Sequence, residues 1–269
     1  MAKKITIQLI GADDDKKDVR LSDFIEQLKN IKRALRETEL ALSNQAIIDY
    51  KIVGLRRNSP SEVDLEPIGF AEQPPPPQEH ISRVVSHFTA ELKLIKTKGE
   101  LLARPDLERL HAFQEIGHQP DNRIAAVKIR AGKTAVTIDD KFKQRLETIV
   151  GPDELAYGTI SGMLEAVNFH NTNRFTLYPP LGPKKISGTF TQERRPKVKE
   201  AIGNFVTAVG LLKYKEWSPF PHGIIAEDID IHEPESELPT LSQLRGVFAG
   251  SMGEMNSVEF IEHLRREDG

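Results

Sequence analysis

Three side chains near residue 230 have the composition of a metal site. Asp228, Asp230 and His232 alternate with Ile229 and Ile231, so their side chains share one face of a strand. Carboxylates and imidazole bind divalent metals, but such a site needs a further ligand at a recognisable spacing. Because no fourth ligand stands at a known spacing, the pattern favours a solvated strand face.

The residue patterns of the common catalytic sites are missing. The sequence has no P-loop, no GxGxxG and no HExxH. The stretch 249–253 lacks the first glycine of a nucleophile elbow, and no strand pattern precedes it. The pairs His80/His87 and His111/His118 are each seven residues apart, two turns of a helix, which is ordinary for core or surface histidines. The sequence therefore favours a non-enzymatic protein, with a hydrolase built from distant carboxylates as a third hypothesis.

The composition indicates a folded protein rather than a disordered chain. Of the 269 residues, 38% are hydrophobic, which is enough for one large domain or two modest ones. The absence of cysteine excludes disulfides, zinc fingers and thiolate nucleophiles and suits a reducing cytoplasm. No stretch approaches the roughly 18 apolar residues of a membrane helix, and the N-terminus does not resemble a signal peptide. We therefore expect a cytoplasmic protein with no cofactor and no membrane partner.

The net charge of −3 is unfavourable for a nucleic-acid-binding protein, but the charge is unevenly distributed. Residues 157–232 contain nine Lys and Arg against seven Asp and Glu, a balance of +2. Residues 233–269 contain three against eight, a balance of −5. The negative charge therefore belongs to the C-terminal tail, and the region before it is slightly basic.

The first 150 residues predict an α+β domain from their apolar periodicities. The expected elements are strands at 3–10, 47–55, 63–70, 123–130 and 134–138, and helices at 22–44, from 78, at 106–116 and at 139–149. Their order is that of a ferredoxin-like unit with extra pieces. An RNA-recognition motif has the same order, but its aromatic stacking pattern is missing.

Gly151-Pro152-Asp153 interrupts the chain and is the predicted domain boundary. We expect a first domain at 1–150, a second at 151–232, and an acidic tail with a terminal helix at 233–269.

The second domain reads as five strands and one short helix. The strands are expected at 159–169, 174–178, 185–191, 205–214 and 223–231, and the helix at 194–202. A five-stranded barrel with its helix between the third and fourth strands resembles the OB-fold family. The resemblance covers about 75 residues and rests on element order.

In that family, ligands bind on strands two and three and between the loops that join strands one–two and four–five. The resemblance implies an outward face that is basic, hydroxyl-rich and flanked by aromatic rings. Its members are Arg174, Thr176, Tyr178, Lys185, Ser187 and Thr189 on the strands, and His170, Asn171, Asn173, Lys215, Trp217, Phe220 and His222 in the loops. Such a face suits single-stranded nucleic acid, which needs cations for phosphates and rings for base stacking.

A structural alternative explains the same residues. Trp217 and Phe220 lie between Ser218, Pro219 and Pro221 and would then anchor a loop on the N-terminal domain. The exposed Lys and Thr side chains would only discourage pairing between sheet edges.

The C-terminal run 257–266 predicts an amphipathic helix and is similar to the partner-binding tails of VapB-type antitoxins. This resemblance implies a protein partner held by Phe260 and Leu264. The alternative is that the helix docks on its own domain. The leading hypothesis is thus a non-enzymatic protein whose barrel binds single-stranded nucleic acid, and the second is an antitoxin-like interaction protein.

Overall fold

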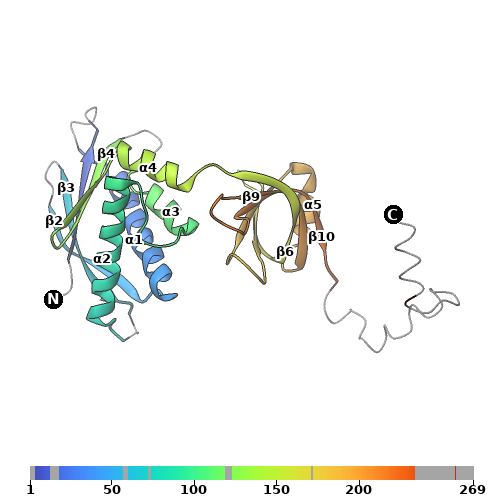
Figure 1. The fold of residues 1–269 in the computed structure, drawn as a ribbon, viewed down its shortest axis with the longest axis horizontal. Helices are drawn as coiled ribbons and strands as arrows, with labels where there is room; N and C mark the ends of the chain where they lie inside the picture. Colours follow the sequence, from blue (N-terminus) through green and yellow to red (C-terminus); the bar gives the residue numbers. More distant parts are fainter. Residues whose placement is uncertain are drawn as a thin grey trace. The chain divides into compact units, whose positions relative to one another are not determined.

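The computed structural model describes residues 4–12, 18–56, 60–71, 74–118, 123–170, 172–233 and 258. The chain is a mixed α+β protein, which confirms the predicted fold class (Figure 1). Contacts divide it into two compact units, Met1–Pro152 and Asp153–Gly269, at the Gly-Pro-Asp break where we expected a boundary. Among the described residues, no helix has the length and apolar character needed to cross a membrane.

The described part of the N-terminal unit contains five strands and four helices, close to the predicted elements. They are β1 (Ile5–Gly11), α1 (Leu21–Ser43), β2 (Ile48–Arg56), β3 (Ser61–Gly69), α2 (Gln78–Lys98), α3 (Leu107–Gln114), β4 (Ile124–Ala131), β5 (Thr134–Ile138) and α4 (Asp140–Val150). The strands form an antiparallel sheet in the order β2-β3-β1-β4-β5. The ferredoxin-like assignment of this unit stays a prediction.

The core of this unit lies between the sheet and its helices, which gather on one face of the sheet (Figure 1). In β1 every second residue is inaccessible to solvent, because Ile5, Ile7 and Leu9 face the helices. From the helix side, Phe88 of α2 and Phe113 of α3 meet edge to face, with their ring centroids 6.0 Å apart.

The second unit is a closed five-stranded barrel. Its elements are β6 (Glu154–Asn168), β7 (Arg174–Tyr178), β8 (Ile186–Phe190), the 3-10 helix η2 (Gln192–Arg194), α5 (Arg195–Glu200), β9 (Phe205–Tyr214) and β10 (Gly223–Ile231). The order around the barrel is β10-β8-β7-β6-β9. Strands β8 and β10 are parallel, and the other pairs are antiparallel.

The long strand β6 allows the barrel to close. It pairs with β9 up to Met163 and with β7 from Met163 onward, so it bends from one neighbour to the other. A Cβ at Gly162 would lie 2.7 Å from the carbonyl oxygen of Tyr178, so glycine is needed where the two strands approach. Strand β6 begins five residues before the strand that we expected at 159.

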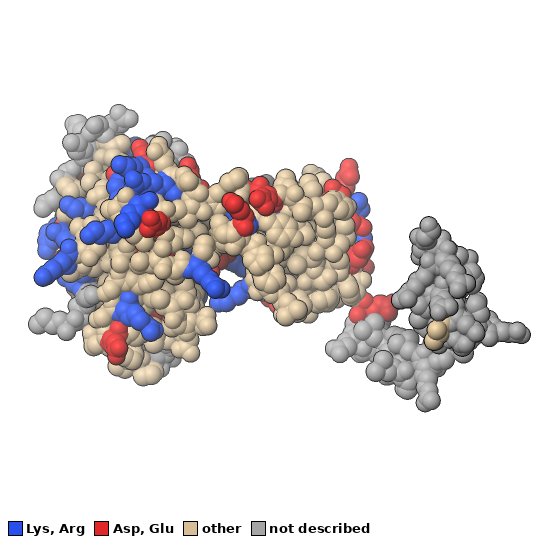
Figure 2. All heavy atoms as spheres, viewed as in Figure 1, with Lys and Arg blue, Asp and Glu red and all other residues tan. Residues whose placement is uncertain are grey.

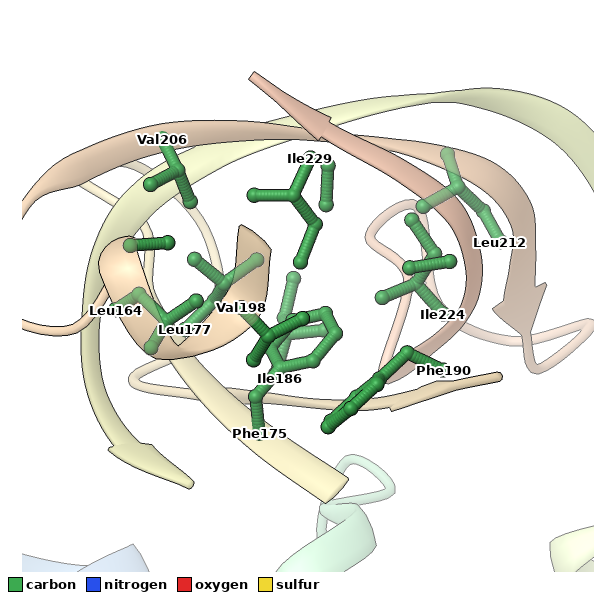
Figure 3. Packing of buried hydrophobic residues seen from close by; sticks show 13 residues of the cluster. Leu164, Phe175, Leu177, Ile186, Phe190, Val198, Val206, Leu212, Ile224 and Ile229 are labelled. Carbon is green, nitrogen blue, oxygen red and sulfur yellow. The ribbon is translucent and has the colours of Figure 1, made fainter. Parts of the chain in front are cut away.

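The barrel interior is filled by aliphatic and aromatic side chains from every strand (Figure 3). Val198 of α5 and Ala201, directly after the helix, add to this cluster, and both are inaccessible to solvent. The predicted C-terminal helix lies outside the described residues except for Val258.

Candidate functional site

The outward side chains of β7 and β8 form a polar row across the two strands. Arg174 stands opposite Thr189, and Thr176 stands opposite Ser187. Arg174 and Ser187 are exposed, and the two threonines are half-buried. This exposure follows the alternation predicted from the sequence, so the row faces solvent.

One end of the row carries an aromatic ring and a lysine. Leu177 is paired with Ile186, so the next residues outward, Tyr178 and Lys185, lie at the same end. Tyr178 is 39% exposed and is paired on its other side with Met163, which is 37% exposed. The sequence analysis missed Met163, although the alternation along β6 could have identified it.

The inward side chains fix the register of this row. Phe175 is paired with Gly188 across the strands, and a Cβ at Gly188 would lie 2.0 Å from the Phe175 ring. Only glycine leaves space for the ring. Because a shift by one residue would turn every outward side chain inward, this contact helps decide which residues meet solvent.

Arg174 is an exposed cation of the row. Its side chain makes no hydrogen bond or ion pair with the residues that the structure describes. The barrel surface seen in Figure 2 is mostly uncharged, with acidic side chains near its rims.

The loop between β6 and β7 is held from the side of α5. The Arg195 guanidinium donates to the side-chain oxygen of Asn173 at 2.9 Å and to the carbonyl oxygen of Phe169 at 3.0 Å. It also lies over the Phe169 ring, 5.9 Å from the centroid. His170, the predicted contact in this loop, is exposed.

The loop between β9 and β10 differs from the expectation. Lys215 is 7% exposed, and its ammonium lies 2.7 Å from a carboxylate oxygen of Asp153. His222 contacts the same oxygen at 3.0 Å. Burial alone would raise the pKa of Asp153, but the hydrogen bonds from Lys215 and His222 outweigh burial and hold it below its ordinary value. Lys215 therefore ties the loop to the start of β6 and does not face a ligand.

The two aromatic residues of the same loop differ in exposure. Trp217 is half-buried, and its indole N–H is buried without a hydrogen-bond partner among the described residues. Phe220 is 49% exposed and packs on the loop after β7, where a Cβ at Gly182 would lie 2.8 Å from its ring. Phe220 therefore offers the more accessible ring.

The metal-like residues of β10 are engaged in ion pairs and hydrogen bonds. The Lys197 ammonium lies 3.0 Å from Asp228 and 3.2 Å from Asp230. Its hydrogen bond lowers the pKa of Asp228. His232 contacts the hydroxyl of Thr207 at 2.7 Å. No group of three or more potential metal ligands occurs in the described part of the chain.

Two histidines that the sequence analysis considered lie beside buried carboxylates. His80 lies 2.7 Å from the buried carboxylate of Glu39, and His87 lies 3.6 Å from that of Glu91. Phe260 and Leu264, the expected partner contacts, lie outside the described residues, as does the stretch 249–253.

Comparisons with protein families, with curated proteins and with solved structures found no match for this chain. The geometry of the barrel is therefore the basis on which its function is argued.

Proposed function

We propose that the second unit is an OB-fold that binds single-stranded nucleic acid across the outward face of β7 and β8. The observation that carries this proposal is the exposed row from Arg174 to Tyr178 on a closed five-stranded barrel.

The strand order supports the assignment to the OB-fold. The barrel runs β6-β7-β8-β10-β9 and closes back on β6, with η2 and α5 between β8 and β9. An OB-fold is a five-stranded Greek-key barrel, and its second and third strands carry oligonucleotides and oligosaccharides. The corresponding strands here are β7 and β8.

The side chains of the row favour nucleic acid among these ligands. Arg174 and Tyr178 lie four residues apart, about 13 Å along an extended strand. A cation at one end meets a phosphate, while a ring at the other end stacks on a base. The same face carries the hydroxyl groups of Thr176, Ser187 and Thr189, which can donate hydrogen bonds to phosphate or sugar oxygens.

The proposed interface keeps most of the residues predicted from the sequence but omits Lys215 and Trp217. Lys215 is omitted because Asp153 holds its ammonium. Trp217 is omitted because it is half-buried, which leaves the more exposed Phe220 as the ring of the β9–β10 loop. Lys185 and His170 remain in the set because both are exposed.

Fluorescence anisotropy with labelled RNA and DNA single strands of about twelve nucleotides tests the proposal. We expect binding that weakens as salt rises, because phosphate contacts release counterions. Arg174→Glu and Lys185→Glu should each weaken binding about tenfold or more and lower the salt slope by about one. Tyr178→Ala should weaken it about tenfold through lost stacking.

Lys199→Glu is the matched control. It makes the same charge change on an exposed lysine of α5, outside the β7–β8 face. Absent binding, binding indifferent to salt, or equal losses in Lys199→Glu and Arg174→Glu would contradict the proposal.

A further inference from the structure

The sheet of the N-terminal unit ends in a strand that is unpaired on one side. Strand β2 is the last in the order β2-β3-β1-β4-β5 and pairs only with β3 in the described part of the chain (Figure 1). It is nine residues long. Its free edge therefore presents backbone N–H and C=O groups that another strand can satisfy.

The side chains of this edge are unusually apolar for a solvated strand. Ile52 is 56% exposed, Val53 is 46% exposed and Leu55 is 64% exposed. An exposed hydrophobic edge strand of this length is a site of association with a further strand.

Helix α1 carries two further exposed apolar side chains. Lys32 of α1 lies 2.7 Å from Asp49 of β2, which places that side of the helix next to the strand. Leu21 and Ile25 are four residues apart, and Lys32 follows Ile25 by seven, so all three lie on one side of the helix. Leu21 is 74% exposed and Ile25 is 44% exposed.

We propose that a second copy of this chain occupies this edge. Its β2 would run antiparallel to the first, with a two-fold axis between Ile52 and Val53. The two sheets would then form one continuous sheet, and the same surface on each copy would contact its counterpart.

The register follows from the bulge in β2. The pairing with β3 shifts between Ile52 and Gly54, so Val53 is an extra residue in β2. The residues after Val53 therefore point to the opposite faces from those that an unbroken alternation would give. Tyr50 pairs with Pro67, and Leu55 pairs with Val63. Both therefore lie on the face of the sheet that carries the buried side chain of Val63.

With the axis between Ile52 and Val53, the paired side chains share a face and are complementary. Tyr50 of one copy meets Leu55 of the other, and Asp49 meets Arg56, an opposite-charge pair. Asp49 already pairs with Lys32, and Arg56 already pairs with the carboxylates of Glu62 and Asp64. The new pair would therefore connect two existing groups of ion pairs.

One alternative register is disfavoured. If the axis lay between Val53 and Gly54, Lys51 of one copy would stand opposite Arg56 of the other, and like charges in that position are destabilising. In the proposed register Arg56 stands opposite Asp49 instead.

Sedimentation velocity of the full chain over a range of concentrations tests the dimer. We expect a concentration-dependent dimer for the natural sequence and a dissociation constant about tenfold higher or more for Ile52→Lys, which places charge at the axis. Leu155→Lys is the matched control, because Leu155 is also 56% exposed but lies in the barrel. A natural chain that stays monomeric, or equal association in the two variants, would overturn the proposal.

Disulfide trapping tests the register independently of any effect of lysine on folding. The chain has no cysteine, so Ile52→Cys and Val53→Cys each introduce a single thiol. Because opposite positions of antiparallel strands come within disulfide reach, an oxidised mixture of the two variants should give more cross-linked dimer than either variant alone. Cross-linking no greater than that of Leu155→Cys would overturn the proposal.

Discussion

The interiors of the two units are built from different side chains. In the N-terminal unit eight polar or charged residues are buried among the described residues. They are Asp23, Gln27, Thr38, Glu39, Asp64, Thr89, Glu91 and Arg109. In the described part of the barrel the corresponding set is Lys215 alone. The first unit therefore adds directional polar contacts to its hydrocarbon core, whereas the described part of the barrel core is almost wholly hydrocarbon.

The buried polar groups of the N-terminal unit join segments that are distant in the sequence. Glu39 accepts hydrogen bonds from the backbone N–H groups of Ile47 and Ile48, at the start of β2. Gln27 accepts from the N–H of Gly117 and donates to the carbonyl oxygen of His118. These groups satisfy buried backbone positions, which gives them a structural role.

The barrel leaves its polar side chains outside, because its interior takes only apolar ones (Figure 3). The exposed row on β7 and β8 is thus available to a ligand without a loss of core contacts. This contrast favours the barrel as the place of the proposed binding function. Four substitutions test whether the interiors of the two units differ in this way.

Arg109→Met should give the largest loss of stability. Arg109 is 1% exposed, and its guanidinium lies 3.4 Å from Glu91, which is inaccessible to solvent. Removing one partner of a buried pair leaves a charge uncompensated and costs about 3–5 kcal/mol. Urea unfolding followed by far-ultraviolet circular dichroism at pH 7 measures this loss.

Part of the stability that Arg109→Met loses at pH 7 should return as the pH falls. Burial raises the pKa of Glu91, and Arg109 opposes that rise, so Arg109→Met raises it further. A carboxyl group whose folded pKa exceeds its unfolded pKa binds protons more tightly when folded, so stability falls as pH rises between the two values. The double variant Glu91→Leu/Arg109→Met should restore most of the loss. Equal instability of the single and double variants would contradict the argument.

Gly188→Ala tests whether the barrel depends on shape. The added methyl group would lie 2.0 Å from the Phe175 ring, so the core must rearrange at a cost of about 2–3 kcal/mol. Trp217 is the only tryptophan and lies in the barrel, so its fluorescence in urea reports this unit. Ser187→Ala, on the exposed side of the same strand, should change stability by less than about 0.5 kcal/mol. Comparable losses in both variants would mean that this ring contact does not fix the strand.

Glu39→Ala should destabilise the N-terminal unit by about 2 kcal/mol, because it leaves buried N–H groups without an acceptor. Its carboxylate is 1% exposed and also contacts His80 at 2.7 Å. Glu39→Gln keeps one acceptor oxygen and should lose less. Urea unfolding of the two variants makes the comparison, and an equal loss in both would show that the hydrogen bonds contribute little.

The sequence predicted the elements far better than the partners of individual side chains. Strands β7, β9 and β10 have the predicted bounds, since their periodicity and the flanking turns are local properties. Alternation also predicted that Arg174 and Lys185 face outward. The pairing of Lys215 with Asp153 joins residues 62 positions apart, so no local pattern could reveal that this lysine is buried.

The same long-range geometry explains why Asp228 and Asp230 are not a ligand set. The sequence correctly placed them on one face of a strand, but Lys197 reaches them from α5. Which cation approaches a strand depends on how the helix packs, and that packing is decided by the barrel core. Strand faces are therefore predictable from sequence, whereas ion pairs between elements require the fold.

Asp153→Asn should have the smallest effect and concerns the exception to the contrast, the buried lysine of the barrel. The folded pKa of Asp153 lies below the ordinary value of 3.8. Its ionised form therefore contributes stability that is present above about pH 4 and is lost as pH falls through the folded pKa. The difference in Tm between the natural chain and Asp153→Asn, followed by Trp217 fluorescence, should be constant from pH 7 to about 5 and shrink toward pH 3. A difference that stays the same over this range would mean that Lys215 is held by packing of its stem and not by the carboxylate, and the barrel interior would then depend on hydrocarbon contacts throughout.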